Sequence, residues 1–344
     1  MDLPLSTYGA DESGLICGYV FEAGQPAVAL ESRAAVSTME ELRQAAARPG
    51  QSPDRFLWLH FNLSHAGAAR WLERHAGLSP TFYDALKDEL RSTRIERDEE
   101  ALVAVVNDVH FDFSFEASDI ATLWISLDSR VVVTARQSPL RSIDQLRIAI
   151  KGGEPIRSTV ELLERLLRAQ ADVLVEIMRN VTRQIDKVED DLLAGKLDLK
   201  RAKLGTLRRL LVRLQRLLAP EPASLFRLLQ HPPHWMAELD AQQLREATEE
   251  FSVALRDMAS LQERIKLLQE EVAAIVNEQN SRSLFVLTVV TVLALPINIL
   301  AGLFGMNVGG VPLAQNEHGF WVVVGIVAAF TLVAGWVAFR RRGP

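Results

Sequence analysis

The sequence predicts an α+β fold, a mixed sheet with covering helices followed by long helices, and then two C-terminal transmembrane helices. Three observations support this prediction. Strand-like and helical runs alternate up to residue 153, residues 234–295 contain neither glycine nor proline, and two long uncharged apolar stretches lie near the C-terminus. These patterns are typical of a layered domain, a continuous long helix and membrane spans, respectively.

The composition excludes several classes of protein. The 344 residues include 38 Lys and Arg against 44 Asp and Glu, which gives a net charge of −6, and 48% of them are hydrophobic. A chain this apolar is not disordered, its length allows about two domains, and its acidity argues against general nucleic-acid binding. Because Cys17 is the single cysteine, an intrachain disulfide and a multi-cysteine metal site are impossible. The N-terminus lacks a basic segment followed by an apolar core, so we expect no cleavable secretory signal.

Residues 1–153 are expected to form an α/β domain. Runs rich in Val, Ile, Phe and Trp predict strands at residues 15–21, 56–63, 102–111, 122–127 and 131–136. Helical runs lie between them at residues 39–47, 66–75, 81–90 and 140–150. Ser37 and Glu40 have capping-box spacing, and Pro80 and Pro139 are placed as first-turn prolines. The mixture predicts a mixed sheet covered by helices.

Residues 154–233 are expected to be all-helical. A linker at residues 151–155 precedes them, and Ser158 with Glu161 has capping-box spacing at the start of a stretch without glycine or proline that runs to residue 194. Further helices are predicted at residues 197–218 and around residues 224–230, the latter closed by the adjacent prolines 232 and 233.

Residues 234–304 are expected to form one long stalk helix that continues into the membrane. Its apolar residues recur at alternating steps of three and four: Phe251, Ala254, Met258, Leu261, Ile265, Leu268, Val272 and Ile275. That period predicts that the helix packs along other helices.

Two transmembrane helices are predicted, at residues 284–304 and 320–339. The first has 21 residues and reaches about 31 Å as a helix, the thickness of the hydrocarbon core of a bilayer. Two such runs side by side disfavour the alternative, a buried helix of a soluble protein. The loop at residues 305–319 has no Lys or Arg, whereas Arg282 and the basic tail at residues 340–344 flank the spans. The positive-inside rule therefore places both termini in the cytoplasm and the loop outside.

A polar stripe follows one face of the long helix and continues into the first span. It consists of Glu270, Asn277, Ser281, Leu284, Thr288, Thr291, Leu295 and Asn298. Two spans cannot enclose a polar path alone, so we interpret the stripe as the lining of a wet axis in a homo-oligomer. The alternative is that the Thr hydroxyls bond their own backbone and that the Asn bonds across helices.

The first span offers an ion only neutral oxygens. It contains no Asp, Glu, His or Cys, so a divalent ion is expected to cross largely hydrated, with the Asn and Thr oxygens touching its water shell. Leu284 and Leu295 are predicted to be hydrophobic constrictions that gate the path by dewetting. No cofactor is expected.

The segment after the first span reads Gly305-Met306-Asn307, followed by the sequence Gly-Gly-Val-Pro at residues 309–312. Gly-Met-Asn at the outer end of the first of two C-terminal spans resembles the signature of the CorA family of divalent-cation transporters. The Gly-Gly-x-Pro continuation, together with Pro296 inside the span, is similar to the ZntB zinc-transporter branch of that family.

This resemblance implies a homopentamer with a funnel-shaped cytoplasmic domain, embedded in the lipid of a bacterial inner membrane. It further implies that Gly305, Met306 and Asn307 form the outer selectivity entrance, and that the transported ion is Zn²⁺, with proton coupling. Two departures from the magnesium-transporting members favour the ZntB branch: Phe304 stands where they carry Tyr, and Leu313 where they carry an acid. Glu317 and His318 are candidates for a replacement ring at the mouth.

Alternative functions and sites stay open. One alternative is transport of Mg²⁺, Co²⁺ or Ni²⁺, and another, of a different class, is a membrane-anchored regulatory or scaffold protein. An enzyme is disfavoured because no nucleophile–base pair is evident from spacing. Two weaker candidates for cation sites are the pair His231 and His234 and the acidic run at residues 189–191. A third is the alternating set Asp108, His110 and Asp112, and we interpret this set by default as a hydrated strand edge. The arginines at residues 208, 209, 213 and 216 are expected to form a solvated or salt-bridged face.

Overall fold

The computed structural model describes residues 9–46, 55–88, 93–98, 100–114, 119–195, 200–306, 312 and 317–340, with the side chains of residues 46, 200, 201 and 337–339 excepted. The chain divides into two compact units, Met1–Leu268 and Gln269–Pro344. Each unit is considered by itself below.

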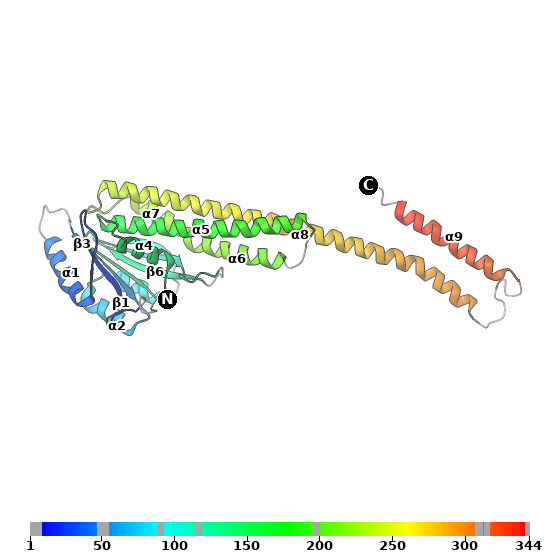
Figure 1. The fold of residues 1–344 in the computed structure, drawn as a ribbon, viewed down its shortest axis with the longest axis horizontal. Coiled ribbons are helices and arrows are strands. Elements are labelled where there is room, and N and C mark those ends of the chain that lie inside the picture. Colours follow the sequence, from blue (N-terminus) through cyan, green and yellow to red (C-terminus); the bar gives the residue numbers. More distant parts are fainter. Residues whose placement is uncertain are drawn as a thin grey trace. The chain divides into compact units, whose positions relative to one another are not determined.

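The first unit is built around a seven-stranded mixed sheet (Figure 1). Its strand order is β2-β1-β3-β7-β6-β5-β4, in which β3 and β7 are parallel and all other neighbours are antiparallel. The strands are β1 (Leu15–Glu22), β2 (Val28–Leu30), β3 (Arg55–Asn62), β4 (Arg94–Asp98), β5 (Ala101–Val109), β6 (Ile120–Leu127) and β7 (Val131–Arg136). The predicted mixed sheet is therefore confirmed.

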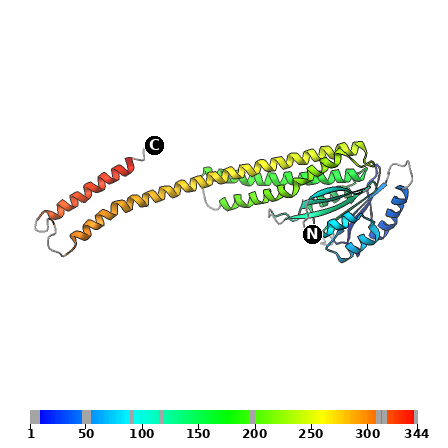
Figure 2. The same cartoon turned by 180° about the vertical axis from the view of Figure 1, so that it is seen from behind.

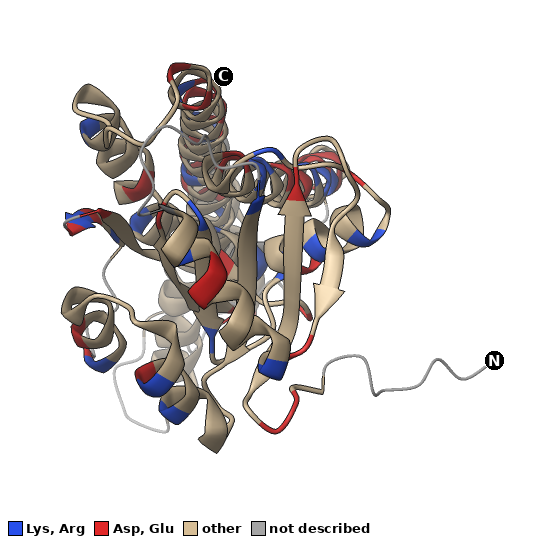
Figure 3. Ribbon diagram, turned by 90° about the vertical axis from the view of Figure 1, so that its left-hand side faces the viewer, with Lys and Arg blue, Asp and Glu red and all other residues tan. Residues whose placement is uncertain are grey.

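Five strands lie where the sequence predicts them, and β2 and β4 were missed. These two strands occupy the two edges of the sheet. β2 has only three residues, and the sequence of β4 is Arg-Ile-Glu-Arg-Asp, so neither carries the apolar alternation of a strand that is buried on one face. Figure 3 shows the charged residues mainly on the helices and at strand ends, with most of the strand surface uncharged.

Short helices cover one face of the sheet. They are α1 (Ser32–Ala46), α2 (Ala66–Trp71), the π-helix η2 (Leu72–Ala76) and α3 (Pro80–Lys87). The predicted cap at Ser37 is wrong, because α1 already begins at Ser32 and the Ser37 hydroxyl donates to the carbonyl of Ala34. Pro80 does begin its helix as predicted. Pro139 does not, because it precedes the N-cap residue Leu140.

A second group of helices covers the opposite face. They are α4 (Arg141–Lys151), α5 (Thr159–Leu193), α6 (Lys200–Leu218), α7 (Pro220–Gln230) and the first part of α8 (Glu238–Phe304). The predicted cap at Ser158 is confirmed, since its side chain accepts the N–H of Glu161 at 3.0 Å. The Glu161 carboxylate accepts the N–H of Arg157, one residue before the position of an ordinary capping box, at 2.9 Å.

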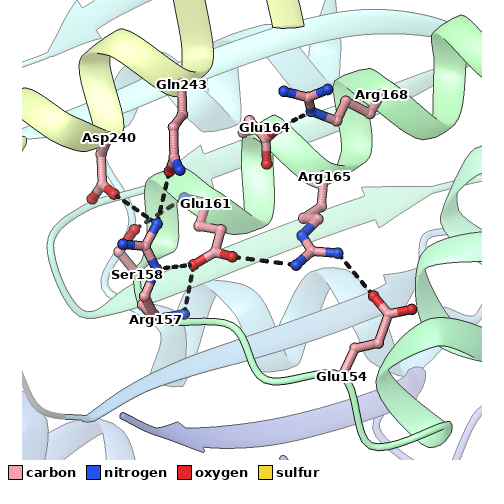
Figure 4. Close-up of polar contacts among 9 residues, drawn as sticks. All are labelled: Glu154, Arg157, Ser158, Glu161, Glu164, Arg165, Arg168, Asp240 and Gln243. Atoms are coloured by element: carbon pink, nitrogen blue, oxygen red, sulfur yellow. Dashed lines mark hydrogen bonds and ion pairs between the residues drawn. The ribbon is translucent and has the colours of Figure 1, made fainter. Parts of the chain in front are cut away.

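A network of ion pairs ties α5 to α8 (Figure 4). Arg157, beside the start of α5, donates to Glu161 at 2.8 Å and to Gln243 of α8 at 2.7 Å. Arg168 of α5 pairs with Glu250 of α8 at 3.0 Å. Further along, Arg264 of α8 donates to Glu189 and to Asp186 of α5. The acidic run at residues 189–191 is thus engaged in helix packing, through Glu189.

Helix α8 is continuous over 67 residues, from Glu238 to Phe304. Figure 2 draws it as one uninterrupted helix, as the lack of glycine and proline over residues 234–295 predicts, although it begins at residue 238 and not at residue 234. Phe251, Met258 and Ile265 are fully buried, and this confirms that the apolar seam packs in the first unit. The second unit contains the rest of α8 and α9 (Gly319–Arg340).

Candidate ion-conduction path

The second unit exposes two long apolar helical stretches. By length and composition, α8 and the segment Gly319–Trp336 of α9 are each able to cross a membrane. Their large apolar side chains are exposed; for example, Leu287 is 63% and Leu332 is 74% accessible. This contradicts the alternative of buried core helices. A surface this apolar requires lipid or other copies of the chain to cover it.

The polar stripe lies on the exposed surface of α8. Asn277, Ser281, Thr288, Thr291 and Asn298 are all exposed. The hydroxyls of Thr288 and Thr291 donate to the carbonyls of Leu284 and Leu287, four residues earlier, both at 2.8 Å.

These two bonds decide what the threonine oxygens can do. A hydroxyl has one hydrogen to donate and two lone pairs to offer. Since the hydrogens of Thr288 and Thr291 are engaged with the helix backbone, their oxygens face outward as acceptors only. The backbone bonding that was the alternative to a pore role therefore leaves both threonines able to accept hydrogen bonds from the water shell of a cation.

Helix α9 lies against another side of α8. A cavity of about 800 Å³ between the two helices is lined by Ile297, Leu300, Ala301 and Phe304 of α8 and by Val323 and Val327 of α9, among others. At 100° per residue, the mean direction of these α8 residues lies about 140° from the mean direction of Thr288, Thr291 and Asn298, and Ala301 comes nearest to the stripe, about 60° from Asn298. The second helix thus leaves the polar stripe uncovered.

The two predicted gates are exposed on the same stripe. Leu284 is 63% and Leu295 is 57% accessible, and Glu270 is also exposed, closer to the start of α8. Leu295 is followed by Pro296, which stands inside the helix. Because proline has no N–H, the carbonyl of Val292 lacks its usual donor four residues on.

Backbone hydrogen bonds hold the chain close to the helix end at Gly305. Its N–H donates to the carbonyl of Ala301 at 2.9 Å, and the N–H of Met306 donates to that of Leu303 at 3.4 Å. Gly305 has no positive φ, so left-handed backbone geometry is not the reason for glycine at this residue. A Cβ on Gly305 would instead lie 3.1 Å from the Ala301 carbonyl oxygen, which favours glycine by close approach. Asn307 and Leu313 lie outside the described residues.

Aromatic residues mark both ends of α9. Trp321, with Phe320 beside it, lies near the start, and the guanidinium of Arg340 lies 4.6 Å from the ring centre of Trp336 near the end. Tryptophans at both ends of a span and a basic residue at one end are typical of a helix anchored at two membrane interfaces. His318 and Glu317, next to the start of α9, are exposed.

The structure shows the surroundings of the other candidate sites. Asp108 is buried and not on a hydrated strand edge, because β5 lies between β4 and β6. It accepts hydrogen bonds from Ser142 and from the N–H of Val109, while burial raises its pKa to about 6. His234 lies 3.4 Å from the carboxylate of Glu100. In the described part of the chain no group of three or more His, Cys, Asp or Glu residues could hold a metal ion.

One buried carboxyl was missed by sequence reasoning. Glu221, in the first turn of α7, is 3% exposed, and its Oε2 has no hydrogen-bond partner among the described residues. Burial and the nearby charge of Asp108 hold its pKa well above the ordinary value. A Pro-Glu-Pro sequence at a helix start gives no sequence signal of such burial.

Comparisons with known proteins agree with this architecture. A family model described as CorA-like Mg²⁺ transporter protein matches residues 53–341. The divalent cation transporter CmaX of Pseudomonas aeruginosa is 30% identical over 336 residues, which cover 96% of this chain and 97% of CmaX. The zinc transport protein ZntB of Yersinia enterocolitica is 24% identical over 279 residues, which cover 81% of this chain and 85% of that protein.

Solved structures give the same result for the fold. The structure of full-length CmaX matches with a TM-score of 0.75 at 29% identity, over 96% of this chain and 98% of that chain. The CorA magnesium transporter from Methanocaldococcus jannaschii matches with a TM-score of 0.74 at 21% identity, over 95% and 98% of the two chains, which shows a common fold. The chain therefore belongs to the CorA family of divalent cation transporters, as a membrane protein with two C-terminal transmembrane helices and not an enzyme.

Proposed function

We propose that the chain forms a homopentamer in a bacterial inner membrane and conducts hydrated divalent cations, chiefly Zn²⁺, along an axis lined by α8. The observation that carries this proposal is the uncovered stripe from Asn277 to Asn298, which α9 leaves open. A single chain cannot close a path around this stripe, whereas five copies related by a symmetry axis supply the other walls. The pentamer and the Zn²⁺ preference are also what the Gly-Met-Asn resemblance implies.

The cation crosses with its inner water shell in place. The stripe within the first span offers amide and hydroxyl oxygens and no charged ligand. Stripping a divalent ion of its water would require several anionic or carbonyl ligands to compensate. Outward acceptor oxygens at Thr288 and Thr291 instead receive hydrogen bonds from metal-bound water, which carries acidic protons.

The leucine positions act as gates and Glu270 as an attractor. Rings of Leu284 and Leu295 would narrow the path with apolar surface, which expels water when the ring closes. The exposed carboxylate of Glu270 would form a ring of negative charge outside the apolar span and raise the local concentration of cations. At the opposite end, Gly305, Met306 and Asn307 would form the entrance, with both termini of the chain in the cytoplasm.

The assignment is tested by cation flux into proteoliposomes that contain the full chain. Thr291→Val and Asn298→Leu remove stripe oxygens and should each reduce flux by about tenfold or more, a loss of one or two water-mediated hydrogen bonds per copy. Thr331→Val is the matched control, because the Thr331 hydroxyl bonds the carbonyl of Val327 in α9 at 2.8 Å, with the same geometry but away from the stripe. Equal flux in all three variants would contradict the proposal.

Mg²⁺ is the second candidate ion. The family model is described as a Mg²⁺ transporter, and a path lined only by oxygen ligands suits a hard cation. The ZntB relatives and the lack of an acid after Pro312 support Zn²⁺. Parallel flux measurements with Zn²⁺ and Mg²⁺ distinguish the two, and greater Mg²⁺ flux would replace Zn²⁺ in the proposal.

The same assay distinguishes transport from a purely regulatory or scaffold role. Asn307→Ala should abolish or strongly reduce flux if this residue forms the entrance. A membrane-anchored scaffold would show no protein-dependent flux in the wild type.

A further inference from the structure

The first unit contains a polar cavity that the conduction path does not use. It has a volume of about 540 Å³ and lies between the loop before β1, the start of α1, α2 and the π-helix η2. Its charged and aromatic lining consists of Glu12, Arg33, Arg70, Trp71, Arg74 and His75. All of these residues belong to the α/β part of the first unit, far in the sequence from the stripe on α8.

The cavity carries an excess of positive charge. Three guanidinium groups line it, and Glu12 is the only acid among its lining residues. Arg33 and Arg74 form no ion pair or hydrogen bond within the described residues, and Arg70 donates only to the carbonyl of Ala66 in its own helix, at 3.4 Å. By contrast, Arg157, beside the start of α5, and Arg165 and Arg168 within α5 are all ion-paired. Exposed guanidiniums that gather around one cavity without carboxylate partners are placed to bind an oxyanion.

Part of the cavity wall is formed by the loop at residues 11–14, which is held in shape by hydrogen bonds and by close packing. The Asp11 carboxylate accepts the N–H of Ser13 at 2.9 Å and that of Leu15 at 3.0 Å. Gly14 has a φ of +82°, and a Cβ there would lie 2.7 Å from the Cβ of Ala68. Such close packing against α2 fixes the shape of the cavity. The Asp11 carboxylate does not itself line the cavity and is engaged by these donors.

The loop and α2 meet through a second glycine. A Cβ on Gly67 would lie 2.6 Å from the backbone carbonyl oxygen of Glu12, so only glycine allows this approach. The two glycines thus bring Glu12 next to α2, whose Arg70 and Trp71 line the same cavity.

The aromatic side of the cavity is also fixed in place. The Trp71 ring packs against Phe61, with ring centres 4.9 Å apart, and against His75, at 5.5 Å. Its indole N–H forms no hydrogen bond within the described residues, whereas those of Trp58, Trp124 and Trp235 all donate to protein oxygens. The π-helical turn at Leu72–Ala76 follows directly and carries Arg74 and His75. Single π-helical turns of this kind are frequent at functional sites.

We propose that this cavity binds a small multivalent phosphate anion, either inorganic polyphosphate or the phosphate groups of a nucleotide. Arg33 and Arg74 form charge-assisted hydrogen bonds with the phosphate oxygens, Arg70 contributes positive charge, and the Trp71 indole N–H is a further donor. Glu12 opposes binding by repulsion. Such a site would make the soluble unit of the transporter responsive to phosphate compounds; it does not depend on the identity of the transported ion.

Calorimetric titration of the full chain in detergent, without divalent cations, tests the proposal with pyrophosphate and ATP as probes. We expect binding that weakens with added salt. The double variant Arg33→Gln/Arg74→Gln should weaken it at least tenfold. The control Arg213→Gln/Arg227→Gln removes the same charge from exposed positions on α6 and α7 and should leave binding unchanged. Glu12→Gln should tighten binding about threefold or more, and this outcome cannot arise from misfolding.

The two probes separate the possible sources of phosphate. Tighter binding of ATP than of pyrophosphate, with the difference lost in Trp71→Leu, would identify a nucleotide. Equal binding would identify inorganic polyphosphate. No binding of either probe at millimolar concentration, or equal weakening in the two double-arginine variants, would overturn the proposal.

Discussion

Asp108 carries a carboxyl group in a buried environment, where its negative charge is unfavourable. It is buried on β5, bonded to Ser142 and to the N–H of Val109, and near the second buried carboxyl, Glu221. Burial raises the Asp108 pKa from 3.8 to about 6. The protonated side chain therefore predominates in the folded protein up to about pH 6.

This shift predicts a pH dependence of stability. Because the folded-state pKa lies above the unfolded one, the contribution of Asp108 is complete below about pH 4 and is lost as the pH rises through about 6. A shift of about two units corresponds to about 3 kcal/mol. The difference in free energy of unfolding between wild type and Asp108→Asn should change by about this amount between pH 4 and pH 7. Chemical denaturation at several pH values measures it.

The control for this experiment is Asp112→Asn, an exposed acid close to Asp108 in the chain. Asp112→Asn should show the same dependence of the free energy of unfolding on pH as the wild type. A profile that is the same in Asp108→Asn and wild type would refute the role of Asp108.

At the scale of elements, α8 is held by its buried apolar seam. Phe251 is fully buried, whereas Val253, two residues later on the same helix, is 47% exposed. Phe251→Ala should lower the free energy of unfolding by about 3–5 kcal/mol through lost burial and a new cavity. Val253→Ala should change it by about 0.5 kcal/mol or less. Thermal or denaturant unfolding of the full chain in detergent, followed by circular dichroism, makes the comparison; similar losses in both variants would contradict the seam.

Elements with a strong period were predicted from the sequence, and elements set by tertiary contacts were not. The seam of α8 and the strand at residues 131–136 follow from apolar spacing alone. The edge strand β4 has no such spacing, because it is stabilised by pairing with β5. The predicted start of α1 lies too late in the chain, because the segment Ser32–Thr38 has no strong apolar period and the Ser37–Glu40 spacing is typical of a helix start.

The sequence predicted that the stripe residues share one face of the helix, whereas the bonding of the threonine hydroxyls to the backbone was only one of two alternatives. The three- and four-residue spacing placed Thr288, Thr291 and Asn298 on one face because the helix has no break. That the threonine hydroxyls donate to the backbone depends on side-chain rotamers, which no spacing encodes. The burial of Asp108 likewise depends on the neighbouring strands and helices, so the alternation of polar residues gave the wrong interpretation.

For the whole molecule, the proposal requires a closed ring of identical chains. The exposed apolar surface of α8 and α9 exceeds what a soluble monomer tolerates, and lipid together with neighbouring copies would cover it. Native mass spectrometry of the detergent-solubilised protein should give five copies of the 38.3 kDa chain. A monomer or a dimer as the largest species would contradict the ring.

The most direct test of the central claim is the accessibility of stripe positions from water during transport. Cys17 is the only native cysteine, and burial raises its pKa to about 11, so it reacts slowly with thiol reagents at neutral pH. We expect Thr291→Cys and Asn298→Cys to react with a charged, water-soluble thiosulfonate and to lose cation flux, while Thr331→Cys in α9 keeps its flux. Equal protection of all three positions, or flux that persists after the stripe cysteines are modified, would show that the stripe does not line the path.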